Sequence, residues 1–285
     1  MRANGRRGCL RCGMRTGPPP GPRPTPNDSP EGADSRGGPG QGWWNLSTRA
    51  IDERSGAGVG TGGSPRRMLI TAGPTHEPID AVRFIGNRSS GRMGLALAGA
   101  AAADGWDVVL LLGPTGSDAA IPGVRTRRFR TCENLRGLLR EECPGCDVLV
   151  MAAAVADYRP KVDPAFLGGK FRRQDQKLVL ELEPTPDLLA EVSAARRSDQ
   201  LFVGFALEPR RELLESARSK LERKGVDLVV GNPLETMDSP TIEATVLTRG
   251  GGIRPSPGVV PKAEFASWLV GVLSEELALL RARKG

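Results

Sequence analysis

Apolar and polar positions along the chain are grouped in blocks that predict buried strands alternating with helices. Continuous apolar runs at residues 68–72, 108–112 and 148–155 have the length of buried strands. Residues 91–104, between the first two runs, are rich in Ala, Leu and Met and are followed by a glycine, which is typical of a buried helix and its C-terminal cap. Because buried strands that alternate with helices usually pair in parallel, this part of the chain predicts a parallel sheet.

The alternation continues to the end of the chain and becomes less regular after Arg159. We expect further strands at residues 124–129, 178–182, 201–206, 226–230 and 244–248, and further helices at 134–142, 186–195, 211–224 and 262–283. The sequence therefore predicts an α/β fold, with a doubly wound, Rossmann-like, mostly parallel sheet and an antiparallel extension in its later part.

Residues 1–65 do not follow this pattern. They contain 15 Gly, nine Pro and nine Arg but only 14 apolar residues, so they cannot bury enough apolar surface to offset the entropy lost on folding. We expect a disordered Gly/Pro/Arg-rich tail at 1–65 and a folded domain at 66–285. Trp43 and Trp44 could anchor a partner on this tail, and a solvated tail or an over-extended gene start are the alternatives.

Composition and charge exclude several classes of protein. More than half of the net charge of +7 lies in residues 1–65, so the charge says little about the folded part. No apolar run approaches the roughly 20 residues that span a bilayer, and no apolar segment follows the basic N-terminus as it would in a secretory signal. Five cysteines, an odd number, fit a reducing compartment better than a disulfide scaffold, which predicts a cytoplasmic protein.

Three of the expected strand ends are rich in small or functional residues. They are residues 72–75, 152–157 and 204–208. In open α/β sheets, ligands bind beyond the carboxyl ends of the strands. Three consecutive alanines at 152–154 leave room for a flat ring, and Asp157 beyond them could bind a ribose hydroxyl or an exocyclic amine. The alternative is close helix–sheet packing, with Asp157 capping a helix.

A second candidate site is the Ser-Ser-Gly sequence at 89–91, where the first helix begins. It offers hydroxyls, backbone N–H groups and the positive end of the helix dipole to an anion. Helix capping alone is the alternative, but Arg83, Arg88 and Arg92 nearby favour a phosphate or carboxylate ligand. Neither a dinucleotide-binding fingerprint nor a P-loop sequence is present.

Cationic, cysteine and histidine residues suggest weaker sites. Lys170 opens a Lys-Phe-Arg-Arg loop, and Lys220 and Lys224 lie one helical turn apart; these groups could neutralise a triphosphate or form ordinary solvated surface. The Cys-x-x-Cys pair at 143–146 has the spacing of a redox motif and could bind zinc together with a second pair in the tail, but the position of neither pair in the sequence favours these sites. The only histidine, His76, is expected in a loop near the site rather than as a catalytic base.

Taken together, these residues resemble one family. The segments 70–80 (ITAGPTHEPID) and 82–94 (VRFIGNRSSGRMG) are similar to the phosphopantothenoylcysteine synthetases, the phosphopantothenate–cysteine ligases of coenzyme A biosynthesis. Residues 152–159 (AAAVADYR), 203–206 (VGFA) and the Lys170 loop resemble the same family in the same order, so the resemblance covers essentially all of the expected domain. The Arg-Met-Gly ending of the long motif resembles the bacterial type, which uses CTP.

The resemblance implies a ligation in two steps. The carboxylate of 4′-phosphopantothenate attacks the α-phosphate of CTP and releases pyrophosphate; the amine of L-cysteine then displaces CMP from the acyl-cytidylate. Mg²⁺ is expected with the triphosphate. The resemblance gives catalytic roles to Asn87, Arg83 and Lys170. Residues implied in binding the nucleotide are Gly73, Ser90, Gly91, Ala153, Asp157, Phe205, Lys220 and Lys224.

The resemblance also implies partners, and the sequence departs from the family pattern in two places. Family members form homodimers through the antiparallel part, and the flavin-dependent decarboxylase fused to many bacterial members would here be a separate protein. Arg172 and Arg173 stand where the family has lysines, and Pro233 stands where it has an aspartate. We expect no membrane or nucleic-acid partner. The alternatives are a nicotinamide-dependent reductase and a nucleic-acid-binding protein led by the Arg/Gly tail.

Overall fold

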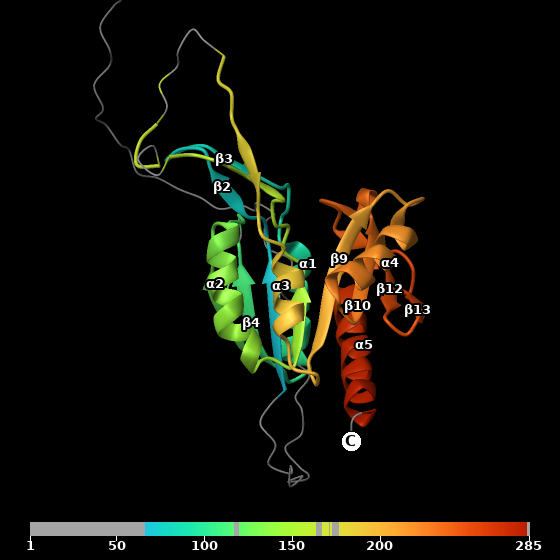
Figure 1. Cartoon of the computed structure of the whole chain (residues 1–285). Helices are drawn as coiled ribbons and strands as arrows, with labels where there is room; N and C mark the ends of the chain where they lie inside the picture. Colours follow the sequence, from blue (N-terminus) through green and yellow to red (C-terminus); the bar gives the residue numbers. More distant parts are fainter. Residues whose placement is uncertain (1–65, 117–119, 164–166, 171, 173–176, 284–285) are drawn as a thin grey trace, which may run out of the picture. The chain divides into compact units, whose positions relative to one another are not determined.

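The computed structural model describes residues 66–116, 120–163, 167–170, 172 and 177–283 (Figure 1). The expected tail at 1–65 lies outside these residues, so its disorder remains a prediction. None of the helices within the described ranges is long and apolar enough to cross a membrane.

An eight-stranded sheet with the strand order β13-β12-β10-β9-β6-β1-β4-β5 forms the centre of the domain. The strands from β10 to β5 in this order are parallel, whereas β12 and β13 pair antiparallel at one edge. In the same order the strands span Ile253–Pro255, Thr245–Thr248, Leu228–Pro233, Leu201–Glu208, Val148–Met151, Arg67–Ala72, Asp107–Leu112 and Val124–Arg128. The predicted α/β fold with a mostly parallel sheet is therefore confirmed.

Helices cover both faces of this sheet, as the prediction of a doubly wound fold requires. α1 (Arg92–Ala103) and α5 (Lys262–Ala282) pack on one face. α2 (Cys132–Glu142), α3 (Leu188–Ala195) and α4 (Leu213–Lys224) pack on the other. Figure 1 shows α2 and α3 in front of the strands.

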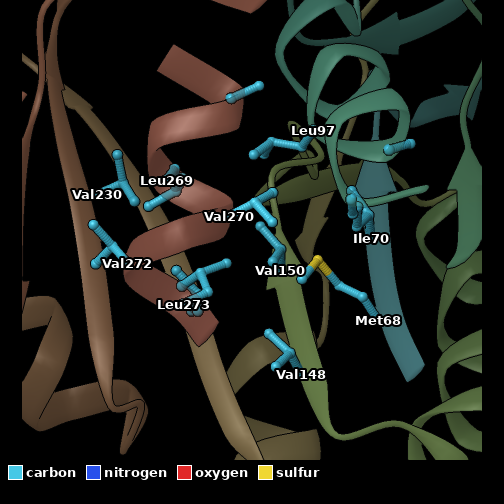
Figure 2. Close-up of a cluster of buried hydrophobic side chains, with 14 of the residues drawn as sticks. Met68, Ile70, Leu97, Val148, Val150, Val230, Leu269, Val270, Val272 and Leu273 are labelled. Carbon is cyan, nitrogen blue, oxygen red and sulfur yellow. The ribbon is translucent and has the colours of Figure 1, made fainter. Parts of the chain in front are cut away.

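Side chains that alternate along each strand supply the two hydrophobic layers. Met68 and Ile70 of β1 pack in the layer under α1 and α5, whereas Leu69 between them packs in the layer under α2, α3 and α4. Figure 2 shows the first layer, in which Val270 of α5 lies beside Val150 of β6. Because both sides of the strands are buried, their sequences are continuous apolar runs rather than alternating ones.

Three short antiparallel strand pairs and two 3₁₀ turns complete the described domain. The strand pairs are β2–β3 (His76–Pro78 and Phe84–Gly86), β7–β8 (Tyr158–Pro160 and Leu182–Pro184) and β11–β14 (Thr241–Ile242 and Val260–Pro261); the turns are η1 (Cys143–Gly145) and η3 (Leu234–Thr236). The later part of the chain therefore does contain the predicted antiparallel pairing. Its expected role in dimerisation remains a prediction.

Two of the expected strands differ most from the structure. The apolar run at 148–155 forms a strand only as far as Met151, because the chain then leaves the sheet and the Ala153 N–H donates to the Thr71 hydroxyl. The strand expected at 178–182 is placed at Leu182–Pro184, since pairing with β7 sets its bounds.

Candidate functional site

A cavity of about 660 Å³ lies at the carboxyl ends of β6, β9 and β10, beside the start of α1. Its lining combines the residues that enter α1, the segment after β6, the end of β9 and the loop after β10. The described residues around it include Asn87, Arg88, Ser89, Ser90, Gly91, Arg92, Ala152, Ala153, Ala154, Asp157, Phe205, Glu208, Lys220, Asn232, Thr236, Asp238 and Lys262. Two of the three expected strand ends, 152–157 and 204–208, and the start of the first helix therefore line one cavity, whereas residues 72–75 lie outside its described lining.

The start of α1 forms one wall of the cavity and is suited to an anion. Gly91 precedes the helix with a φ of 71°, and no side chain caps the helix there. A Cβ on Gly91 would lie 2.9 Å from the Thr115 Cγ2, so both conformation and space require glycine. Because the first N–H groups of a helix have no partners within it, they and the neighbouring Ser90 can bind a phosphate or carboxylate.

The segment after β6 forms another part of the lining and is held to the end of β1. The Ala153 N–H donates to the Thr71 Oγ1 at 3.1 Å, and the Ala156 N–H donates to the Thr75 Oγ1 at 3.0 Å. Both threonines are fully buried. These bonds fix a wall of small side chains at residues 152–154, which leaves the space that the alanine run predicted.

Asn87 and Asp157 lie at this same wall. The Asn87 side-chain amide donates to the Val155 carbonyl oxygen at 3.0 Å, which joins the entrance of α1 to the segment after β6. Asp157 is exposed and borders the cavity. It precedes strand β7 rather than a helix, so the alternative interpretation of Asp157 as a helix cap is wrong.

Lys220 of α4 brings a partly buried cation to the cavity beside Phe205 of β9. Its amine donates to the Phe205 carbonyl oxygen. Burial, and then the nearby charge of Lys224, lower the pKa of Lys220 below that of an ordinary lysine. Lys224 pairs with Asp187 and lines a smaller adjoining cavity of about 210 Å³, which Lys220 and Phe205 also line. The two lysines predicted to act together thus have different surroundings.

Several predicted residues lie outside the described lining of the main cavity. Lys170 is exposed. The Arg83 guanidinium binds the buried carboxylate of Asp80, with its Nε 2.9 Å from the Oδ2. Gly73 is buried with a φ of 80°, and a Cβ there would lie 2.8 Å from the Thr115 Cγ2, so this position requires glycine; its expected role in binding remains a prediction. His76 stacks on Phe84, and burial lowers its pKa.

The cysteines form no metal site among the residues that the structure describes. Cys143 and Cys146 are buried beside Gln200, whose amide donates to both of their carbonyl oxygens at 2.8 Å. The second Cys-x-x-Cys pair lies outside the described residues. Sequence reasoning missed a different group, the loop after β10 with Thr236 and Asp238, together with Lys262. No local motif marks these residues, because only the fold brings them to the cavity.

Comparison with known proteins identifies relatives for most of the chain. The profile of the family described as DNA/pantothenate metabolism flavoprotein, C-terminal domain, matches residues 64–276. A protein named cysteine/cysteine sulfinic acid decarboxylase, from an unknown prokaryotic organism, is 44% identical over 170 residues, which are 60% of this chain and 46% of that protein. The coenzyme A biosynthesis bifunctional protein CoaBC of Mycobacterium tuberculosis (strain ATCC 25618 / H37Rv) is 43% identical over 176 residues, 59% of this chain and 41% of that protein.

A solved structure agrees with these sequence relatives. The C-terminal domain of a coenzyme A biosynthesis bifunctional protein CoaBC matches with a TM-score of 0.62 and 32% identity, over 76% of this chain and 96% of that domain. The chain spans less than half the length of the curated relatives described above. The activities of those whole proteins are therefore used only as a basis for proposals.

These comparisons correct the expected chemistry. The flavoprotein description of the family and the decarboxylase name of a relative contradict the phosphopantothenate–cysteine ligase, and with it the expected CTP and Mg²⁺. They also contradict the expected substrates and the separate decarboxylase partner, because the decarboxylase name belongs to a relative of this chain itself. The physical reason is that the motifs describe a strand-end cavity and its helix, and such a cavity does not by itself specify a reaction.

Proposed function

The chain belongs to the DNA/pantothenate metabolism flavoprotein C-terminal domain family, and from this premise we propose that it acts in coenzyme A biosynthesis on a phosphorylated conjugate of pantothenate and cysteine, 4′-phosphopantothenoylcysteine. The cavity at the strand ends is the observation that carries this proposal. Pantothenate metabolism, cysteine and coenzyme A biosynthesis are all named among the family and the relatives, and the cavity adds the chemistry for the phosphate.

Each part of such a ligand has a suitable wall in the cavity. Ser90 and the first N–H groups of α1 suit the phosphate. The small side chains at 152–154 and the ring of Phe205 suit the uncharged pantothenate chain. The Lys220 ammonium, at the same wall as Phe205, suits the carboxylate.

Decarboxylation is the reaction we propose for this ligand, favoured by the name of the relative that is 44% identical. The carboxylate leaves as carbon dioxide and the carbon that held it gains a proton, so the overall step needs no net oxidant. Lys220 is suited to return that proton. Its lowered pKa means that it gives up a proton more readily than an exposed lysine.

The flavin implied by the family's description fits only part of the cavity. The start of α1 suits the phosphate of a flavin mononucleotide. Phe205 is the only aromatic side chain in the described lining, and that lining contains no His, Tyr or Cys to exchange protons with a flavin or a thiol near neutral pH. The described residues therefore do not fit the redox-active ring, and we derive no step through it.

The proposal is tested first by binding. At a 4′-phosphopantothenoylcysteine concentration of about 100 times its Kd, the full chain should gain roughly 2.7 kcal/mol of stability, read as a rise in Tm. The dephosphorylated conjugate at the same concentration should give a clearly smaller rise. Equal shifts with the two ligands, or no shift with either, would refute the phosphate-binding part of the proposal.

The reaction is tested by following release of carbon dioxide from the same conjugate, with and without added flavin mononucleotide. We expect release in at least one of the two conditions. If neither condition releases carbon dioxide although the conjugate binds, the proposed reaction fails and the proposed ligand stands. The cytoplasmic location also remains part of the proposal, and fractionation of cells that produce the chain would test it.

A further inference from the structure

Three cations at the mouth of the cavity are bound by oxygen atoms of one loop, residues 236–238. The Arg88 Nη2 lies 2.5 Å from the Asp238 Oδ2, and the Arg92 Nη1 donates to the Asp238 carbonyl oxygen at 3.3 Å. The Lys262 amine donates to the Thr236 carbonyl oxygen at 3.3 Å. All five residues line the cavity, and Arg88 and Asp238 are 150 positions apart in the chain.

Asp238 is held in an unusual backbone conformation at this point. Its φ is 58°, and it is the only residue other than glycine with a positive φ in the described part of the chain. A left-handed conformation costs about 1 kcal/mol or more in most residues, although Asp and Asn tolerate it better than others. The loop around it is tied back on itself, because the Thr236 hydroxyl accepts from the Asn232 amide at 2.8 Å and donates to the Pro233 carbonyl at 2.7 Å.

The positive charge at the cavity mouth exceeds what this loop neutralises. Arg92 and Lys262 are close enough that Arg92 contributes, after burial, to lowering the pKa of Lys262. Against the three cations the loop offers one carboxylate and two carbonyl oxygens. The pair of Arg88 and Asp238 is also largely exposed, with 77% and 46% of the two side chains accessible, so it is weak and easily exchanged for a better anion.

We propose that Asp238 is an internal substitute for the anionic group of the ligand: its carboxylate binds Arg88 until a phosphate displaces it, which releases loop 236–238 from the cavity mouth. Asp238 thereby selects ligands by charge, because only a ligand with sufficient negative charge can displace its carboxylate from Arg88. A neutral group gains nothing by displacing a carboxylate from Arg88, whereas a doubly charged phosphate does. This inference rests on the proposed function only in that the cavity binds an anion.

The test measures the Kd of inorganic phosphate for the full chain by calorimetric titration. Asp238→Asn keeps the size of the side chain and tolerates the left-handed conformation, but it removes the competing charge. We expect it to bind phosphate about 3- to 5-fold more tightly than the natural chain, the upper end of what an exposed ion pair is worth. Glu243→Gln removes the same charge from a surface pair with Arg210 outside the cavity lining, and should leave the Kd within 2-fold.

A double-mutant cycle assigns the effect to the ion pair. In an Arg88→Gln background, Asp238→Asn should no longer tighten phosphate binding, because the two residues act through one contact. Weaker or unchanged binding by Asp238→Asn would overturn the inference and indicate that the pair merely holds the loop in place. Equal gains with Asp238→Asn and Glu243→Gln, or no phosphate binding by any variant, would overturn it as well. Tighter phosphate binding without any binding of 4′-phosphopantothenoylcysteine would support the inference and count against the proposed ligand.

Discussion

The two ends of the parallel strands use their charged residues differently. Where the strands begin, the aspartates beside the strand starts are bound by arginines. Where the strands end, the polar groups surround a cavity. Arg67 binds Asp107 at 2.8 Å, Arg281 binds Asp147, and Arg196 binds Asp227. At the cavity the charges come from elements far apart in the chain and the small residues leave space between them. Similar charged residues therefore stabilise the fold at one edge and remain available to a ligand at the other.

The largest expected effect is on stability, at the edge where the strands begin. Asp227→Ala removes a carboxylate that accepts from the Phe202 N–H at 2.9 Å and from Arg196, and the two paired side chains are only 15% and 16% exposed. Because the buried arginine loses its partner, we expect the free energy of unfolding to fall by about 3 kcal/mol. Urea denaturation measures this.

The matched control for Asp227 is the exposed pair of Arg197 and Asp199, whose side chains are 46% and 48% accessible. Asp199→Ala should lower stability by less than about 1 kcal/mol. Similar losses for the two variants would contradict the distinction between buried and exposed pairs. Neither variant should change the affinity of the cavity for phosphate, since both lie at the far edge.

A smaller loss of stability, now coupled to the site, is expected in helix α1. A Cβ added at Gly94 would lie 2.4 Å from the Ala72 Cβ, so Gly94→Ala must push α1 away from β1. We expect a loss of about 2 kcal/mol and weaker ligand binding, because the start of α1 moves with the helix. Denaturation and calorimetric titration of the same sample measure both effects.

Gly99 of the same helix provides the control for Gly94. Its nearest neighbour to an added Cβ is the Ile121 Cγ2 at 3.9 Å, an ordinary contact. Gly99→Ala should therefore stabilise the chain by up to about 1 kcal/mol through helix propensity, with ligand binding unchanged. Destabilisation by both substitutions would show that α1 tolerates no added side chain, which the packing does not predict.

A third expected effect changes binding rather than stability. Lys220→Met removes the partly buried ammonium, and we expect the Kd of 4′-phosphopantothenoylcysteine to rise about 10-fold, or roughly 1.4 kcal/mol. Stability should stay the same or increase, because desolvation of the charge is costly. Lys177→Met, at an exposed position outside the cavity lining, should leave the Kd unchanged. Binding of this conjugate to the natural chain should also weaken as the pH rises, because Lys220 loses its proton. Since the pKa of Lys220 is lowered, this weakening should occur at a lower pH than for an ordinary lysine.

The smallest expected effect is a difference between the natural chain and Glu142→Gln in how their stability depends on pH. The Arg125 guanidinium, 2.6 Å from Glu142, and Arg127 lower the pKa of this carboxyl from 4.5 to about 2. The stabilisation is present above pH 4.5 and is lost as the pH falls towards 2. As the pH falls over this range, we expect the Tm of Glu142→Gln to fall a few degrees less than the Tm of the natural chain. The difference is small because the arginines are partly solvated. Parallel acid profiles would refute the role of the pair.

Much of the fold was predictable because it depends on local sequence. The continuous apolar runs predicted β1 and β4 to within one residue, and the Ala-rich segment predicted α1 in the same way. The strand pairs β2–β3 and β11–β14 were not predicted. Strands of two or three residues are defined by their partner rather than by any pattern of their own.

The site was predictable only in part for a related reason. Ser90, Ala153, Asp157 and Phe205 come together at the cavity because strand ends of a parallel sheet share an edge. Asp238 and Lys262 could not be predicted, since their contacts depend on how distant loops pack. The reaction was predicted wrongly, because the motifs describe a strand-end cavity and its helix, and such a cavity does not by itself specify a reaction.

The most direct test of the central claim, that the cavity at the carboxyl edge binds a phosphorylated conjugate, is calorimetric titration of the full chain with 4′-phosphopantothenoylcysteine. We expect a single site, a Kd at least about 10-fold lower than that of the dephosphorylated conjugate, and competition by inorganic phosphate. Equal affinity for the two conjugates, with no competition by phosphate, would contradict it.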